Sequence, residues 1–95
     1  MSPLKYRVMI VDDEEDMRTI LTMALSQKYE VFSATNGLDA MLKLDKYQPD
    51  VAIVDMMMPL MNGFDLSKKI RKKEGFTDMP ILALSALNSS ADIKN

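Results

Sequence analysis

Three aspartates stand directly after short apolar segments of the chain. Asp12 and Asp13 follow "RVMIV", and Asp55 follows "VAIV". Segments of this length, rich in β-branched residues, are typical of strands buried in a sheet. Ser85 follows a similar segment, "PILAL". If these strands are parallel, their carboxyl ends lie at one edge of the sheet, and the three carboxylates and the hydroxyl converge there.

Converging carboxylates repel one another, and at least one of them has a raised pKa unless a cation neutralises the charge. The chain of 95 residues contains no cysteine and no histidine, so oxygen atoms are the donors for such a cation. Oxygen donors favour Mg²⁺, which keeps several of its waters and admits a phosphate oxygen. Each acid taken alone is equally well explained as a solvated loop residue. The set of four residues predicts a magnesium site.

The elements that position these residues alternate between strand and helix. The segments 7–11, 30–34, 51–54 and 80–84 are expected to be strands. Three helices are expected between them, and "NSSADIKN" is expected to begin a further one. This alternation predicts an α/β fold with a parallel sheet.

The inward faces of the helices follow from apolar spacing. The residues expected on these faces are Met17, Ile20, Leu21, Ala24 and Leu25 in the first helix, Leu38, Met41 and Leu42 in the second, and Phe64 and Ile70 in the third. Asn36 is expected to cap the second helix, and Asn62-Gly63 is expected to form a turn with positive φ before the third.

Composition restricts the class of protein. Apolar residues make up 47% of the chain, which predicts one folded domain over residues 1–95. The absence of cysteine excludes disulfides, and the absence of histidine excludes histidine-based catalytic triads. The net charge of −2 gives no attraction to nucleic acid, and "KKIRKK" is interpreted as a solvated helix face. No apolar run approaches the ~20 residues of a membrane span, so a cytoplasmic protein is expected.

Two other phosphate-handling classes fit the motifs poorly. A nucleotide-binding domain needs a glycine-rich turn after the first strand, but "DDEED" stands there. A phosphatase with a DxD motif needs an acid two residues after its nucleophile, but Met57 occupies that position after Asp55. Neither class is therefore favoured.

The motifs "VMIVDDEED", "VAIVDMMMPLMNG" and "PILALSA" together resemble the receiver domain of two-component response regulators. The resemblance covers nearly the whole chain and implies a doubly wound, flavodoxin-like sheet with strand order 2-1-3-4. It implies a switch protein that modifies itself, rather than an enzyme that turns over an external substrate. A sensor histidine kinase or a phosphotransfer protein is the implied partner.

The resemblance also implies a role for each matching residue. Asp55 is implied to accept a phosphoryl group in a Mg²⁺-dependent reaction, and Asp12, Asp13, Asp55 and the backbone carbonyl of Met57 are implied to bind the ion. Ser85 is implied to be the hydroxyl that carries the switch. The Met57 side chain is implied to border the path of attacking water, and we expect it to tune the lifetime of the phosphoryl group.

The chain departs from this family after the fourth strand. The family continues with a fifth strand, which ends in a phosphoryl-binding lysine, and a fifth helix, whereas this sequence ends at Asn95. An uncovered fourth strand predicts self-association through its edge. The missing lysine leaves an alternative function open, that of a truncated interaction module that is not phosphorylated.

Overall fold

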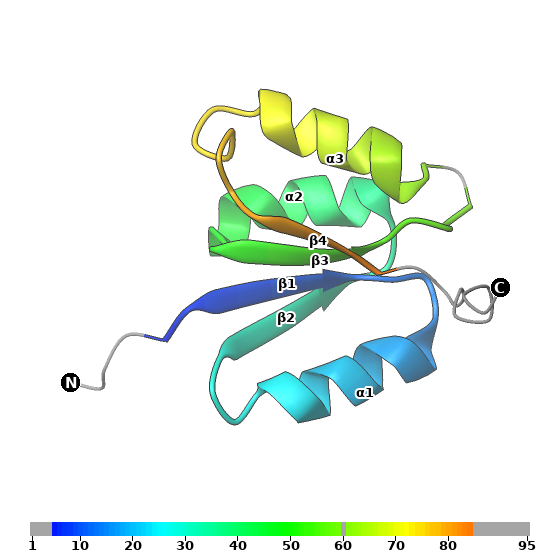
Figure 1. Ribbon diagram of the computed structural model, residues 1–95, viewed down its shortest axis with the longest axis vertical. Coiled ribbons are helices and arrows are strands. Elements are labelled where there is room, and N and C mark those ends of the chain that lie inside the picture. Colours follow the sequence, from blue (N-terminus) through cyan, green and yellow to red (C-terminus); the bar gives the residue numbers. More distant parts are fainter. Residues whose placement is uncertain (1–4, 60, 85–95) are drawn as a thin grey trace, which may run out of the picture.

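Strands and helices alternate along residues 5–59 and 61–84, which are the residues that this computed structural model describes. The elements are β1 (Arg7–Val11), α1 (Glu15–Leu25), β2 (Glu30–Ala34), α2 (Gly37–Tyr47), β3 (Val51–Asp55), α3 (Gly63–Lys72) and β4 (Ile81–Leu84). Figure 1 shows their arrangement. The predicted α/β fold is confirmed, and the predicted bounds of β1 and β2 are those observed. Ser85 and the segment "NSSADIKN" lie outside the described residues.

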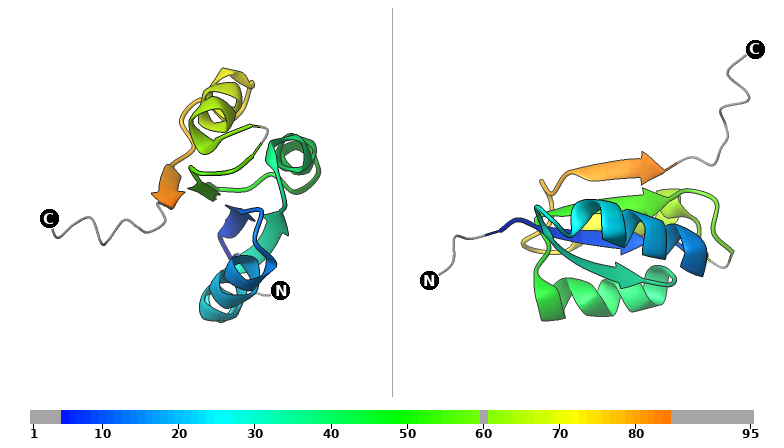
Figure 2. Two further views of the ribbon diagram at one scale, coloured as in Figure 1. Left: turned by 90° about the vertical axis from the view of Figure 1, so that its right-hand side faces the viewer. Right: turned by 90° about the horizontal axis from the view of Figure 1, so that it is seen from below.

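The four strands form one parallel sheet in the order β2-β1-β3-β4, as expected. Helix α1 covers one face, and α2 and α3 cover the other, which the left view of Figure 2 shows along the strands. In the register, Val11 of β1 lies opposite Val54 of β3. The next residue of each segment is an aspartate, so Asp12, which follows β1, lies beside Asp55, the last residue of β3.

The main core lies between the sheet and the pair of helices α2 and α3. It contains Met9 and Val11 of β1, Ala34 of β2, Ala40 and Leu44 of α2, Ala52 and Val54 of β3, Leu66 and Ile70 of α3, and Met58, Phe76 and Met79 of the loops. Because side chains alternate along a strand, Val8 and Ile10 of β1 are buried on the opposite face, under α1.

The face of the sheet that carries α1 is less completely filled. No residue of α1 is fully buried, and its half-buried apolar side chains are Met17, Leu21 and Leu25. Beside the helix lies a groove of about 380 Å³ lined by Tyr6, Val8, Leu25, Tyr29, Asp50, Val51, Ile53, Pro80 and Leu82. This apolar groove runs from α1 towards β4, the strand at the edge of the described sheet.

The predicted inward face of α3 was partly wrong. Ile70 is fully buried as expected, but Phe64 is 65% exposed. The helix starts with Gly63 packed against the end of β3, so the next residues that face the sheet are Leu66 and Ile70. Phe64 lies outside the face formed by Gly63, Leu66 and Ile70.

The predicted inward faces of α1 and α2 are also partly wrong. In α2 the buried residues are Gly37, Ala40 and Leu44, whereas Leu38 and Leu42 are exposed. These buried residues recur three and four positions apart and so lie on one face of the helix, which leaves Leu38 and Leu42 off that face. In α1, Ile20 and Ala24 are exposed, and the apolar residues that are half-buried, Met17, Leu21 and Leu25, recur at every fourth position. Asn36 caps α2 as predicted, accepting a hydrogen bond from the Asp39 N–H at 2.8 Å.

Within the described part of the chain, none of the helices has both the length and the apolar character that a membrane span requires.

Candidate metal centre

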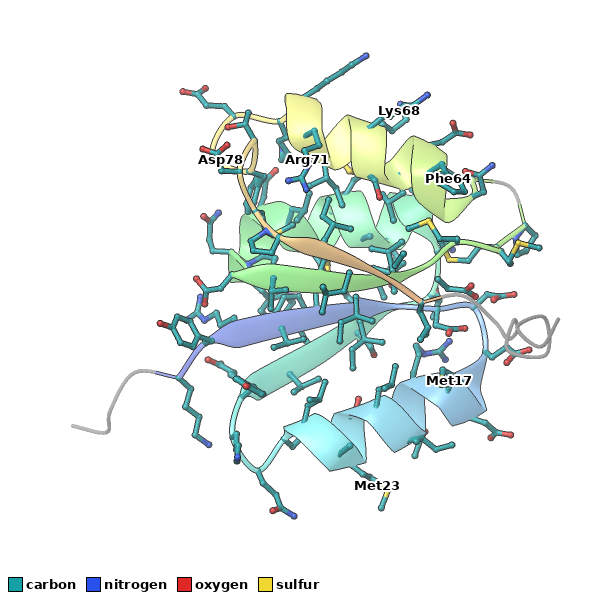
Figure 3. All side chains as sticks on the ribbon, viewed as in Figure 1. Met17, Met23, Phe64, Lys68, Arg71 and Asp78 are labelled. Carbon is teal, nitrogen blue, oxygen red and sulfur yellow. The ribbon has the colours of Figure 1, made fainter. Side chains whose placement is uncertain are left out.

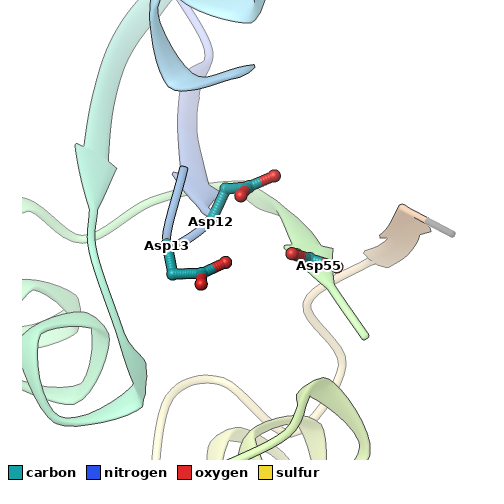
Figure 4. A group of neighbouring side chains, drawn as sticks. All are labelled: Asp12, Asp13 and Asp55. Carbon is teal, nitrogen blue, oxygen red and sulfur yellow. The ribbon is translucent and has the colours of Figure 1, made fainter. Parts of the chain in front are cut away.

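The structure brings the three predicted acids together at the carboxyl edge of the sheet. One oxygen each of Asp12, Asp13 and Asp55 lies within 4.8 Å of the other two. Figure 4 shows the three carboxylates pointing into a common space. Asp12 is only 3% exposed and Asp55 only 9% exposed, whereas Asp13 is open to solvent. The cluster is therefore partly withdrawn from water and accessible from the side of Asp13.

Backbone groups and one arginine hold Asp12 at the end of β1. Its Oδ1 accepts a hydrogen bond from the Glu14 N–H at 2.9 Å, and its own N–H donates to the Ala34 carbonyl at 3.2 Å. Arg18, one turn into α1, donates through Nη1 to the Asp12 carbonyl at 2.8 Å. These bonds tie the start of α1 to the strand end and orient Asp12 without neutralising its carboxylate.

Asp55 is positioned by the last residues of β3 and the loop that follows. Its Oδ1 accepts a hydrogen bond from the Met57 N–H at 2.9 Å. The next residue, Met56, donates its N–H to the Leu84 carbonyl of β4 at 3.2 Å. The side chain is thus oriented by the loop, and its second oxygen has no hydrogen bond from the described residues.

Gly63 has a different role from the predicted one. Neither Asn62 nor Gly63 has a positive φ; Asn62 instead caps α3 and accepts a hydrogen bond from the Asp65 N–H at 2.9 Å. A Cβ on Gly63 would lie 2.6 Å from the Asp55 carbonyl oxygen and 2.7 Å from the Met56 Cα. Glycine is required here because the helix packs directly on the backbone that carries Asp55.

The negative charges of the cluster favour the binding of a cation. Burial raises the pKa of Asp12 above its usual value of 3.8. The negative charges of Asp55, Asp13 and Glu14 add to this rise in pKa, and the hydrogen bond from the Glu14 N–H opposes it. In the part of the chain that the structure describes, the ion pairs are Arg7–Glu30, Lys43–Asp39 and Lys73–Asp45, and none of them includes an acid of the cluster.

The donor set fits a hard divalent cation. Three carboxylate oxygens converge from two strand ends, and a partly hydrated Mg²⁺ needs only a few protein oxygens. Met57 lies beside the cluster through its hydrogen bond to Asp55, and its carbonyl stays a predicted ligand. Ser85, the predicted switch hydroxyl, lies outside the described residues.

The sequence did not predict two features that hold the site. One is the hydrogen bond from Arg18 to the Asp12 carbonyl, and the other is the packing of Gly63 against the backbone of Asp55 and Met56. An arginine one turn after an acidic pair is a weak signal, because many such arginines are solvated. The glycine after Asn62 was noticed, but the close contact depends on where α3 lies against β3.

Residues 8–95 match the family described as "Response regulator receiver domain". The chain therefore belongs to the receiver domains of two-component response regulators, which confirms the family that its motifs resemble. Among solved structures it is similar to the chemotaxis protein CheY4 of Vibrio cholerae, with a TM-score of 0.86 and 33% identity over 96% of this chain and 77% of that one. It is also similar to the non-phosphorylated HemR receiver domain of Leptospira biflexa, with a TM-score of 0.78 and 33% identity over 95% of this chain and 73% of that one. These likenesses confirm the flavodoxin-like fold.

Curated relatives are much longer than this chain. The sensor histidine kinase TmoS of Ectopseudomonas mendocina is 42% identical over 80 residues, which are 84% of this chain and 8% of that protein. The probable transcriptional regulator ycf27 of Guillardia theta is 42% identical over 89 residues, which are 93% of this chain and 34% of that protein. The chain thus spans about a third or less of these two relatives.

The raised pKa of Asp12 predicts how Asp12→Asn changes stability. The native state binds the Asp12 proton more tightly than the unfolded state, so this group's contribution to stability falls as pH rises from 3.8 through the raised pKa. At neutral pH without Mg²⁺, we expect Asp12→Asn to have a higher free energy of unfolding than the wild type, measured by urea denaturation. Mg²⁺ should stabilise the wild type more than the variant. A variant of lower stability, or equal stabilisation of both by Mg²⁺, would contradict this account of the cluster.

The close approach of Gly63 predicts that Gly63→Ala lowers the free energy of unfolding by about 1–3 kcal/mol, as overpacking does. It should also weaken Mg²⁺ binding, because the backbone of Asp55 has to move. Gly37→Ala is the matched control, since Gly37 also begins a helix and the atoms nearest its added Cβ belong to the Met61 side chain. Urea denaturation and calorimetric Mg²⁺ titration of both variants check the prediction. If both variants behave alike, the backbone contact is not what requires Gly63.

Proposed function

We propose that Asp55 accepts a phosphoryl group from the phosphohistidine of a sensor histidine kinase or a phosphotransfer protein, in a reaction that depends on Mg²⁺. One observation carries this proposal: Asp55 ends β3 within 4.8 Å of two further carboxylates, in a chain of the receiver family. A sensor histidine kinase and probable transcriptional regulators contain segments similar to this chain. A switch that links a kinase to an output is consistent with both kinds of relative.

The geometry suits Asp55 to act as a nucleophile. Its Oδ1 is held by the Met57 N–H, and the other carboxylate oxygen would attack the phosphorus atom. The bond from phosphorus to the partner's imidazole nitrogen breaks, that nitrogen keeps the electron pair, and an acyl phosphate forms on Asp55. Mg²⁺ bound by Asp12, Asp13, Asp55 and the Met57 carbonyl would offset the repulsion between the carboxylate and the phosphoryl oxygens. Positioning and charge supply the catalysis, and Asp55 needs no proton transfer.

The phosphoryl group would then change the interactions of the domain. In this proposal the hydroxyl of Ser85 turns towards the phosphoryl group, and the Met57 side chain limits the access of hydrolytic water. The chain acts in the cytoplasm as a self-modified switch rather than an enzyme. Its net charge of −2 supports the expectation that this segment does not bind nucleic acid directly.

The intact mass of the protein after incubation with acetyl phosphate and Mg²⁺ tests the phosphoacceptor. We expect one phosphoryl adduct on the wild type, and none on Asp55→Asn or when Mg²⁺ is removed by a chelator. A wild type that is folded but gains no mass would refute the proposal. It would favour the alternative function, an interaction module that binds partners without phosphorylation.

We also propose that copies of this 95-residue chain associate through β4 and the groove beside it. Within the described residues β4 pairs with β3 alone, and Leu82 of β4 is exposed at the rim of the apolar groove. Unpaired strand edges and apolar patches both favour association. Light scattering over a range of concentrations should show species larger than a monomer.

Leu82→Lys should reduce this association, because a charged side chain disfavours pairing at a strand edge. Leu42→Lys is the control, since Leu42 is equally a leucine exposed to solvent but lies on α2. A wild type that stays monomeric at every concentration would refute the association. Equal effects of the two lysines would show that β4 is not the interface.

A further inference from the structure

The consecutive methionines after Asp55 differ sharply in their exposure. Met56 is half-buried and Met58 is 6% exposed, whereas Met57 between them is 73% exposed. Met56 and Met58 pack with the core, so oxidants in solution reach their sulfur atoms poorly. Among these three side chains, only Met57 presents its thioether to solvent.

The backbone of Met57 is fixed next to the acidic cluster. Its N–H donates to Asp55 Oδ1 at 2.9 Å, so the side chain starts from a peptide group that contacts the phosphoacceptor carboxylate directly. Asp12 and Asp13 complete the cluster within 4.8 Å. A chemical change at the Met57 sulfur therefore takes place at the edge of the site, not on a remote surface.

We propose that Met57 is a site of reversible oxidation by peroxides. The sulfur takes one oxygen atom from hydrogen peroxide and forms methionine sulfoxide, while the peroxide is reduced by two electrons and leaves as water. The reverse step is the reduction of the sulfoxide by methionine sulfoxide reductases, of which one type acts on each epimer. Without cysteine, the chain has no thiol that competes for the oxidant, and methionine is its most readily oxidised residue type.

Oxidation changes what the Met57 side chain does at the site. The thioether is apolar and accepts hydrogen bonds weakly, whereas the sulfoxide is polar and accepts them well. This step rests on the proposed function: the sulfoxide draws water towards the phosphorylated Asp55 and shortens the lifetime of the phosphoryl group. The expected change is about two- to tenfold, the effect of one ordinary hydrogen bond gained in the transition state.

Peptide mapping by tandem mass spectrometry after brief treatment with dilute hydrogen peroxide tests the modification itself, without any phosphorylation. Met23 serves as an internal reference, because it is 70% exposed and points away from the sheet on α1 (Figure 3). We expect Met57 and Met23 to oxidise several-fold faster than the buried Met9 and Met58. Oxidation of Met57 as slow as that of Met58 overturns the proposal.

The lifetime of the phosphoryl group, measured before and after peroxide treatment, tests the consequence. The wild type and Met23→Leu should both lose phosphoryl faster after oxidation, and methionine sulfoxide reductases should restore the original rate. Met57→Leu should show the same rate before and after treatment. An equal acceleration in Met57→Leu, or none in the wild type, overturns the effect on lifetime. If the untreated chain accepts no phosphoryl group, the proposed function fails, while the peptide map still decides whether Met57 is the oxidised site.

Discussion

Repulsion among Asp12, Asp13 and Asp55 is the constraint on which the carboxyl edge of the sheet depends. A parallel sheet delivers the ends of β1 and β3 to one place, and the register sets Asp12 beside Asp55. Burial disfavours the charged form of Asp12 and raises its pKa, and the charges of Asp55 and Asp13 raise it further. The fold tolerates this cost because other contacts hold the strand ends, and the uncompensated charge is what makes the site receptive to a divalent cation.

The contacts that hold the acids leave their charges available. Peptide N–H groups of Glu14 and Met57 bind one oxygen of Asp12 and Asp55, and Arg18 binds a backbone carbonyl rather than a carboxylate. Gly63 lets α3 pack on the backbone of Asp55, which further limits movement of that strand end. Orientation and neutralisation are thus assigned to different partners. The protein supplies the orientation, and in the proposed function a bound Mg²⁺ would supply the neutralisation.

The two faces of the sheet differ in how completely they are packed. The core between the sheet and helices α2 and α3 contains twelve buried residues, whereas the face that carries α1 has an apolar groove that extends to β4. The cluster of Asp12, Asp13 and Asp55 lies at the carboxyl end of the sheet. A partner that covers the groove would contact β4 at Leu82. The last residue of β4, Leu84, pairs with Asp55, so the β3–β4 pair connects the groove with the acidic cluster.

Sequence alone determined the strands, the parallel α/β order and the convergence of the three acids. Apolar segments of strand length are local signals, and a parallel sheet brings their carboxyl ends together whatever the details of packing. The inward faces of the helices were decided by the tertiary structure. In the short helix α2, two sets of residues have helical apolar spacing, one that starts at Gly37 and one that starts at Leu38. Only packing in the folded chain decides that the set starting at Gly37 is buried. The need for Gly63 likewise depends on Asp55, a residue in another element, because only the folded chain brings their backbones into contact.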